Sequence, residues 1–473
     1  MNVSTPNSFA VFVLFSWPIA SIFLYRLAPV VSATLWTILA AELLLPYGTT
    51  FKFEMMPQLD KFSIPTICAL VGCMIVTRRR VQLINNFGLT EVLICSFLVG
   101  PVITSLLNGD AIHFGSTTLP GVGIYDGLSA LLTQLVTLIP FLLGRQFLRN
   151  PRDLKHILET LALAGLIYSI PLLFEIRFSP QLHYWIYGYA PTDFIQEVRD
   201  GGYRPMVFMG HGLTACFFLM TTVVASAALW RMRIRVLRLS AGPITAYLGV
   251  VLILCRSGAA LIYGLVLVPL VRWAKPSLQL RVAVVFAVFA LIYPAMRTAE
   301  VIPTQTILEI ARAVDEARAA SLEVRFTQEE ELLQRATERP LFGWGRFGRS
   351  RVFKVDWQNI GFDSSVTDGR WVITLGVYGL VGFLAEFGLL AIPIIRAVKA
   401  ARVVKSRQEA ISLAAIALIM AINMIELLPN STLHGWSWLV AGALLGCSET
   451  VLARERTQRS QRSFALQFGE LKT

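Results

Sequence analysis

The chain has 473 residues, of which 55% are hydrophobic and only 15% are charged, and its mean hydropathy is +0.62. A soluble domain carries about 25% charged residues, so this composition excludes an ordinary soluble protein and indicates a polytopic membrane protein. The net charge of +12 does not require nucleic-acid binding. The basic residues gather in short loops, as the positive-inside rule expects of a membrane protein, and no nucleic-acid partner is expected.

Apolar stretches recur from one end of the sequence to the other. About twenty helical residues cross the hydrocarbon core of a bilayer, and most of these stretches fit one crossing. We therefore predict an all-α fold, a polytopic membrane helical bundle of about 12–13 transmembrane helices that forms a single membrane domain over residues 1–473. The stretches cover residues 9–25, 28–45, 62–77, 88–107, 122–143, 156–174, 206–229, 241–271, 282–299, 371–395, 410–428 and 433–452.

The stretch 241–271 needs a separate explanation, because both of its flanks are basic and should lie in the cytoplasm. An even number of crossings must then separate them, which two short helices turning near Arg256 or a re-entrant hairpin would satisfy. In either case Arg256 lies at the outer mouth or in a polar cavity. An arginine that faces lipid at mid-depth would cost several kcal/mol.

Six basic clusters are assigned to the cytoplasm, at residues 78–80, 145–155, 231–238, 272–281, 396–407 and 454–462. The C-terminus is then cytoplasmic, and residues 453–473 are predicted to form a basic, disordered tail. The orientation of the N-terminus stays open, because Arg26 alone orients the first pair of helices. Four polar segments face outward: 46–61, 108–121, the extracytoplasmic loop 175–205 and the large extracytoplasmic loop 300–370.

Several kinds of site are not indicated. The six cysteines fall in apolar stretches without metal-ligand spacing, which is typical of small core residues. The sequence has neither a Walker P-loop nor an Asp-x-Asp pair that would hold a metal–nucleotide-sugar complex. We therefore expect no metal, no cofactor and no soluble sugar-nucleotide donor. The first apolar stretch lacks the features of a cleavable signal peptide.

The large loop carries the most distinctive segment of the chain. A helical pattern over 304–338 ends at Pro340, and a basic, glycine-rich segment follows over 339–349. Glycine allows close approach of the backbone to a ligand, Arg346 adds fixed positive charge and Trp344 adds a flat face. This chemistry favours an anionic, sugar-bearing ligand at the membrane surface. The GxGxxG spacing within the segment follows a helix, not a strand, so a dinucleotide site is rejected.

Other candidates lie at the ends of the two long loops. Arg204 follows two glycines and precedes His211, and the aromatic residues of 183–189 suit either sugar rings or a membrane-interface belt. Asp368 and Arg370 stand where the large loop returns to the membrane. They are candidates for a carboxylate base and a phosphate ligand, or alternatively for a helix cap and an interfacial anchor.

Three motifs resemble the O-antigen ligase and O-antigen polymerase family. The Arg-Ser-Gly-Ala of 256–259 is similar to that family's Ser-Arg-Gly region, and 340–345 is similar to its Pro-Leu-x-Gly-x-Gly motif. Residues 375–382 resemble the glycine-rich helix that follows the family's large loop. The resemblance covers residues 200–390, and it rests on the order and spacing of the three motifs.

The resemblance implies a metal-independent, inverting glycosyltransferase of the bacterial cytoplasmic (inner) membrane that uses a polyprenyl-diphosphate-linked oligosaccharide. It implies that Arg204, Arg256 and Arg325 bind the diphosphate, and we add Arg346, Arg370 and Trp344 as substrate contacts. Membrane lipids and a chain-length regulator are the further partners.

Ligases of this family carry a His-Asn pair where this sequence has Thr367-Asp368-Gly369. The departure favours a polysaccharide polymerase over a ligase and leaves the general base open, with Asp368 preferred and His211 as the alternative. A transporter or flippase is the third hypothesis and would require charged residues deep in several helices, for which Glu42, Glu91 and Glu426 are candidates.

Overall fold

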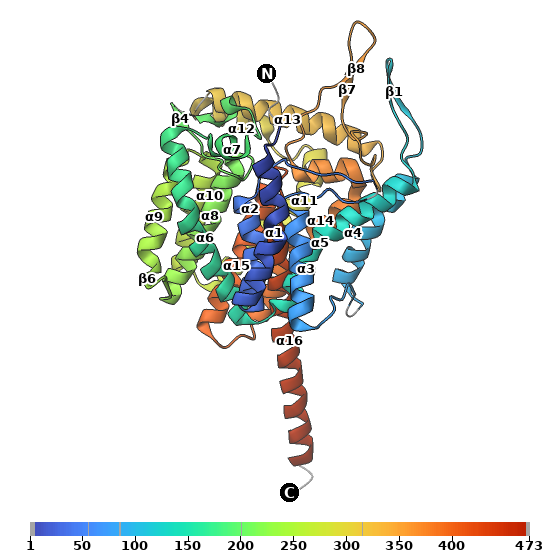
Figure 1. Cartoon of the computed structure of the whole chain (residues 1–473). Helices are drawn as coiled ribbons and strands as arrows, with labels where there is room; N and C mark the ends of the chain where they lie inside the picture. Colours follow the sequence, from blue (N-terminus) through green and yellow to red (C-terminus); the bar gives the residue numbers. More distant parts are fainter. Residues whose placement is uncertain (1–4, 55, 85–86, 200, 315, 470–473) are drawn as a thin grey trace.

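The computed structural model describes the chain except for residues 1–4, 55, 85–86, 200, 315 and 470–473. Within this part, nine helices are long and apolar enough to cross a membrane, and the predicted all-α, multi-pass bundle is confirmed (Figure 1). They are α1 (Ser8–Leu27), α4 (Leu89–Leu106), α5 (Ile124–Phe147), α6 (Pro151–Phe178), α8 (Gly212–Met232), α11 (Pro276–Thr298), α14 (Arg370–Ala401), α15 (Arg407–Glu426) and α16 (Gly435–Gly469).

Four shorter apolar helices complete the bundle: α2 (Val30–Leu44), α3 (Ser63–Thr77), α9 (Ala241–Leu254) and α10 (Gly258–Trp273). The last two confirm the predicted division of the stretch 241–271. Arg256 stands at the turn between them with a φ of +54°, a left-handed conformation that reverses the chain.

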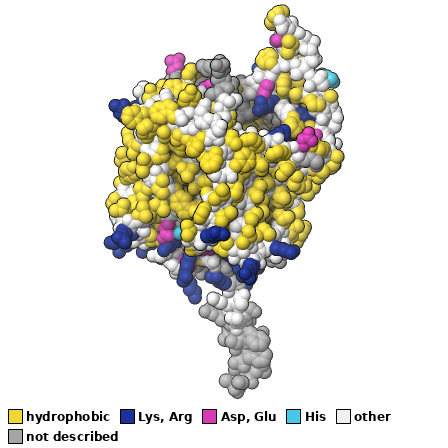
Figure 2. Space-filling view, viewed as in Figure 1, with side chains coloured by type: hydrophobic (Ala, Val, Ile, Leu, Met, Phe, Trp, Pro, Cys, Tyr) yellow, Lys and Arg dark blue, Asp and Glu magenta, His cyan; other side chains and the backbone are white. Residues whose placement is uncertain are grey.

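The surface of the bundle shows how it sits in a membrane. Figure 2 shows a broad hydrophobic belt, and lysine and arginine side chains gather along the edge from which α16 leaves. From the positive-inside rule we expect that edge to face the cytoplasm. We call the opposite end, where the chain begins in Figure 1, the outer end.

The C-terminal segment corrects one prediction. Residues 453–469 were expected to be disordered, but they continue α16 as helix, and 470–473 lie outside the described residues. Arginine, glutamate and glutamine are good helix formers, and an ion pair between Glu455 and Arg459, four residues apart, supports the helix. Basic composition alone therefore does not predict disorder here.

The outer end is covered by the predicted helix of the large loop, which is divided into α12 (Thr304–Val314) and α13 (Glu316–Thr337). The loop before α8 holds α7 (Leu182–Tyr187) and a 3₁₀ turn, η1 (Phe194–Glu197). Four antiparallel two-stranded ladders complete the described elements: β1 (Ile112–Phe114) with β2 (Thr117–Leu119), β3 (Val198–Arg199) with β4 (Gly202–Tyr203), β5 (Arg235–Val236) with β6 (Leu239–Ser240), and β7 (Phe353–Val355) with β8 (Gly361–Asp363).

Helix α14 is broken at Gly379, where φ is +66°. The guanidinium group of Arg370 bonds to Glu386 at 2.6 Å although the two are 16 residues apart in the same helix. A straight helix would separate them by about 24 Å. The two legs of α14 therefore fold against each other at the break.

The glycine-rich segment satisfies the backbone groups that this break exposes. The N–H of Trp344 donates to the carbonyl of Gly376 at 2.8 Å, and the N–H of Leu380 donates to the carbonyl of Pro340 at 2.8 Å. A buried backbone group without a partner is costly, so the break and the segment depend on each other. Two of the motifs that carry the family resemblance thus form one structural unit.

A candidate cavity at the outer end

A cavity of about 250 Å³ opens at the outer end of the bundle. It is bounded by the start of α8, by α13, by the segment before α14 and by the connection between α15 and α16. His211, Arg325 and Asp368, all predicted as site residues, share its wall. The complete lining is Tyr47, Pro191, Thr192, Gly210, His211, Leu213, Thr214, Phe217, Arg325, Asp368, Glu426, Asn430, Ser431, Thr432 and His434.

Arg325 and Asp368 form an ion pair at the mouth of this cavity. Nε of Arg325 lies 3.4 Å from Oδ2 of Asp368, and both side chains are partly exposed. Asp368 does not cap α14, because the helix begins at Arg370 and its N-cap residue is Gly369, with no side-chain capping hydrogen bond. The helix-cap alternative for Asp368 therefore does not fit, and its carboxylate faces a cation instead.

His211 is held by the start of α8. Its Nδ1 accepts a hydrogen bond from the N–H of Leu213 at 3.0 Å, so Nδ1 carries no proton and the neutral ring is protonated at Nε2. Burial lowers the pKa of His211, and the carboxylate of Glu197 only partly opposes this. In this arrangement His211 is a hydrogen-bond donor and not a ready proton acceptor.

Arg204 supports this wall from behind. Its Nε donates to Glu197 at 2.8 Å, and the same carboxylate accepts from the N–H of Gly212 at 2.9 Å. Arg204 and Glu197 are both buried. Arg204 is therefore committed to a buried ion pair that fixes the start of α8, and it does not line the cavity.

Arg256 lies against the β3–β4 ladder. A side chain added at Gly202 would come within 2.6 Å of the guanidinium carbon of Arg256. Gly202 thus makes room for this second arginine. Arg256 therefore lies at the same end of the bundle as this ladder, but it is not among the residues that line the cavity.

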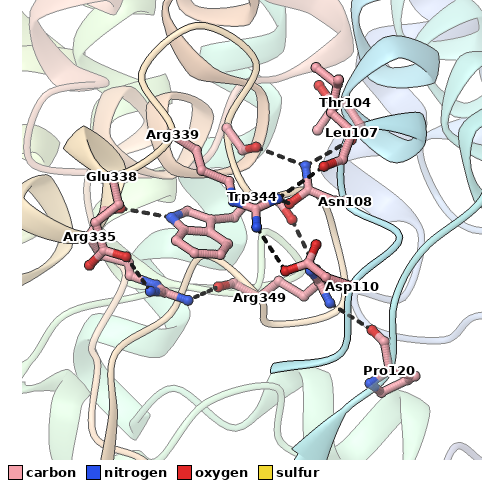
Figure 3. Close-up of polar contacts among 11 residues, drawn as sticks. Thr104, Leu107, Asn108, Asp110, Pro120, Arg335, Glu338, Arg339, Trp344 and Arg349 are labelled. Atoms are coloured by element: carbon pink, nitrogen blue, oxygen red, sulfur yellow. Dashed lines mark hydrogen bonds and ion pairs between the residues drawn. The ribbon is translucent and has the colours of Figure 1, made fainter. Parts of the chain in front are cut away.

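Trp344 offers a ligand no open face. Its indole ring is covered by the guanidinium groups of Arg335 and Arg339, at 3.4 and 4.2 Å from the ring centre, and its N–H donates to the carbonyl of Arg335 (Figure 3). Only 7% of Trp344 is exposed. The structure therefore makes Trp344 the core of the glycine-rich segment and not the predicted sugar contact.

The surrounding arginines anchor the segment to the loop after α4. Arg339 donates to Asn108 at 2.6 Å and to Asp110 at 2.8 Å, and the buried Arg349 donates to Pro120 at 2.8 Å (Figure 3). Although partial burial opposes it, the hydrogen bond from Arg339 holds the pKa of Asp110 below its usual value. These contacts are structural, because every group in them already has a partner.

Two further predicted contacts lie away from the cavity lining. Arg370 is paired with Glu386, which also accepts from Thr374 at 2.6 Å. Arg346 lies 6.0 Å from the ring of Phe347.

The aromatic residues of 183–189 fall into two groups by exposure. His183, Tyr187 and Tyr189 are buried, whereas Tyr184 and Trp185 are about half exposed.

Sequence reasoning missed the connection between α15 and α16. His434 lines the cavity, and its Nδ1 lies 2.9 Å from Oε2 of Glu42 in α2. Glu426 also lines the cavity, and one of its oxygens accepts from Asn430 at 2.7 Å. Both glutamates lie near the ends of apolar stretches, but nothing in the sequence indicates that Glu426 lines the cavity or that Glu42 lies behind His434.

No group of three or more His, Cys, Asp and Glu side chains in the described part of the chain is arranged to hold a metal ion.

The fold defines a multi-pass membrane protein. No family model matches the sequence, and no curated protein is similar to it. The cavity and the three motifs are therefore the features of this protein that point to a function.

Proposed function

We propose that this protein polymerises polyprenyl-diphosphate-linked oligosaccharide repeat units into O-antigen or exopolysaccharide, by metal-independent glycosyl transfer at the outer face of the bacterial cytoplasmic membrane. One observation carries the proposal. His211, Arg325 and Asp368 come from distant parts of the sequence, and they line one cavity at the outer end of the bundle. A lipid-linked donor would reach such a cavity from the membrane.

Arg325 is the donor-binding residue of this proposal. Its guanidinium group is permanently charged and can form two parallel hydrogen bonds with a phosphate. His211 adds the proton on Nε2 as a second donor to phosphate. Both groups would stabilise the charge that develops on the diphosphate as it leaves, a task that a metal ion performs in other transferases.

The acceptor sugar would enter between this donor and Asp368. Its hydroxyl oxygen forms a bond to the anomeric carbon, and the bond from that carbon to the diphosphate breaks with inversion. Polyprenyl diphosphate leaves, and the hydroxyl proton passes to a base in the cavity. Asp368 accepts a hydrogen bond from a neighbouring hydroxyl of the acceptor sugar and so orients it.

A ligase that transfers the glycan to a lipid or protein acceptor would use the same donor site. A transporter or flippase is favoured by a different observation: Glu426 is buried beside the cavity, and its Oε2 has no hydrogen-bond partner among the described residues. These two functions are outcomes of the test below.

The test uses purified protein in lipid vesicles with a lipid-linked repeat unit as substrate. Polymer should form with the wild type and be lost with Arg325→Ala. Arg312→Ala, which removes an exposed arginine from the neighbouring helix α12, should leave it unchanged. Full-length polymer from Arg325→Ala would refute the proposal.

A deletion strain separates the alternatives. Accumulated single repeat units indicate a polymerase, whereas free long polymer indicates a ligase. Proton- or sodium-dependent uptake by the vesicles, without polymer, would favour a transporter.

A further inference from the structure

Glu42 and His434 form a buried acid–imidazole pair beside the cavity. Nδ1 of His434 lies 2.9 Å from Oε2 of Glu42, and the two residues are 5% and 3% exposed. The other oxygen, Oε1, accepts from the N–H of Trp436 at 3.2 Å. Glu42 comes from α2 and His434 precedes α16, so the bundle itself brings together residues from opposite ends of the chain.

The geometry of the pair indicates which ring nitrogen of His434 is free to accept a proton. A proton on Nδ1 would point at Glu42, which leaves Nε2 of the neutral ring as the acceptor. No described residue bonds to Nε2, and His434 lines the cavity whereas Glu42 does not. The contact between Nδ1 and Oε2 is short but not aligned as a good hydrogen bond, as is common in a catalytic site before the substrate binds.

Apart from His434, no side chain in the described part of the chain forms an ion pair with the carboxylate of Glu42. Lys61 contacts the backbone instead, because its Nζ donates to the carbonyls of Glu42 and Phe208, at 2.9 and 2.8 Å. A buried carboxylate is costly without a partner, so protonation of His434 would create that partner where it is needed.

The other titratable groups of the cavity are less suited to take a proton. Asp368 would lose its ion pair with Arg325 on protonation. The Nδ1 of His211 already accepts a backbone N–H. Glu426 has one oxygen occupied by Asn430.

We infer that His434, oriented by Glu42, is the general base that removes the proton from the acceptor sugar hydroxyl in this cavity. The inference rests on the proposed function. Nε2 takes the hydroxyl proton as the oxygen bonds to the anomeric carbon and the bond to the diphosphate breaks. The imidazolium is stabilised by Glu42, as in other acid–imidazole pairs, and it returns the proton to solvent after the diphosphate leaves. Both residues lie outside the region 200–390 that carries the family resemblance.

The experiment compares His434→Gln, Glu42→Gln and the control His113→Gln, which changes an exposed histidine on β1. Polymer formation by the purified proteins in vesicles is measured between pH 5 and 9. We expect His434→Gln to lower kcat by about a hundredfold or more, the usual scale of general-base loss, with little change in KM for the donor. The fall of wild-type activity at acid pH should disappear.

Glu42→Gln tests orientation separately from proton transfer. It should keep the acid limb of the pH profile but move it to lower pH, because the imidazolium loses its partner. His434→Ala should regain activity when imidazole is added, which a structural role would not produce. His113→Gln should match the wild type.

The outcomes separate the two proposals. Wild-type protein that makes no polymer from the lipid-linked substrate overturns the proposed function and this inference together. The inference alone is overturned if the wild type is active and folded His434→Gln keeps both the kcat and the acid limb of the wild type. Should His434→Gln fail to fold, an unshifted acid limb in Glu42→Gln overturns it equally.

Discussion

The guanidinium group of Arg325 lies 3.4 Å from the carboxylate of Asp368, and the two side chains remain 31% and 42% exposed. A solvent-exposed ion pair contributes only about 0–1 kcal/mol. A phosphate could therefore replace Asp368 beside Arg325 at little cost. The pair keeps the arginine oriented toward the cavity without a strong competing interaction.

This relationship predicts the behaviour of Asp368→Asn. We expect kcat to fall by about tenfold, because the acceptor sugar loses an orienting hydrogen bond to a charged group, which contributes about 1.5–3 kcal/mol. The donor KM should not rise, since the amide competes less with phosphate for Arg325. Kinetics with a lipid-linked donor in vesicles provide the measurement, and Glu323→Gln, on the exposed face of α13, is the control. A higher donor KM would mean that Asp368 contributes to donor binding.

A second prediction concerns the contact between the glycine-rich segment and the break in α14. A Cβ at Gly343 would lie 2.6 Å from the backbone nitrogen of Gly379, and Gly343 has a φ of +68°. Gly343→Ala must therefore shift two backbones, and we expect it to destabilise the protein by about 2–4 kcal/mol.

Gly201→Ala is its matched control, because Gly201 has a φ of +71° but open space where the Cβ would stand. It should be destabilised only by placing an alanine in the left-handed region, which costs about 1 kcal/mol. Thermal unfolding in detergent compares the two variants. Equal losses would show that conformation, not the contact with Gly379, determines the effect at Gly343.

Trp344→Ala tests whether the buried indole is structural. Removing it should cost about 3–5 kcal/mol, as for other large aromatic residues in a core, and the two arginines on its faces would lose their partner. Trp357→Ala is the control, because Trp357 is 90% exposed and should change stability little. Unfolding curves and donor binding are measured together. Weaker donor binding in a fully stable Trp344→Ala would restore the role expected from the sequence.

The fold could be predicted well from the sequence because hydropathy and flanking charge are local properties of each helix. The basic flanks of 241–271 required an even number of crossings, and the turn at Arg256 follows from that rule. Three predicted residues, His211, Arg325 and Asp368, share the cavity. His211 and Asp368 stand where a polar loop meets the membrane, which is a local property that a sequence records, whereas Arg325 lies within α13 and was expected from the family resemblance.

The remaining part of the site depends on contacts between distant segments. Gly379 sits in an apolar stretch with no sign of a broken helix, so the partner of the glycine-rich segment could not be identified. The same glycines and arginines suit a phosphate ligand or a buried indole. Glu42 and His434 lie at opposite ends of the chain, and a sequence does not show which helices are neighbours.

The last prediction concerns stability at acid pH and His183, which is fully buried in α7. Its Nε2 accepts the N–H of Tyr47 at 3.1 Å, and its Nδ1 donates to the carbonyl of Tyr189 at 2.8 Å. Burial, with a smaller contribution from the charge of Lys61, lowers the pKa of His183 to about 4. The neutral ring is thus required by the fold.

The sign of the effect follows from proton linkage. The unfolded chain binds a proton at this histidine below pH of about 6.5, whereas the folded protein does so only near pH 4. The contribution is therefore complete above pH of about 6.5 and is lost as the pH falls toward 4, for a total of about 3 kcal/mol. His183→Gln cannot titrate, so its unfolding free energy should depend less on pH in this window than that of the wild type. Denaturation in detergent at pH 7, 6, 5 and 4.5 measures the difference, and parallel pH dependence in the two proteins would show that His183 does not cause it.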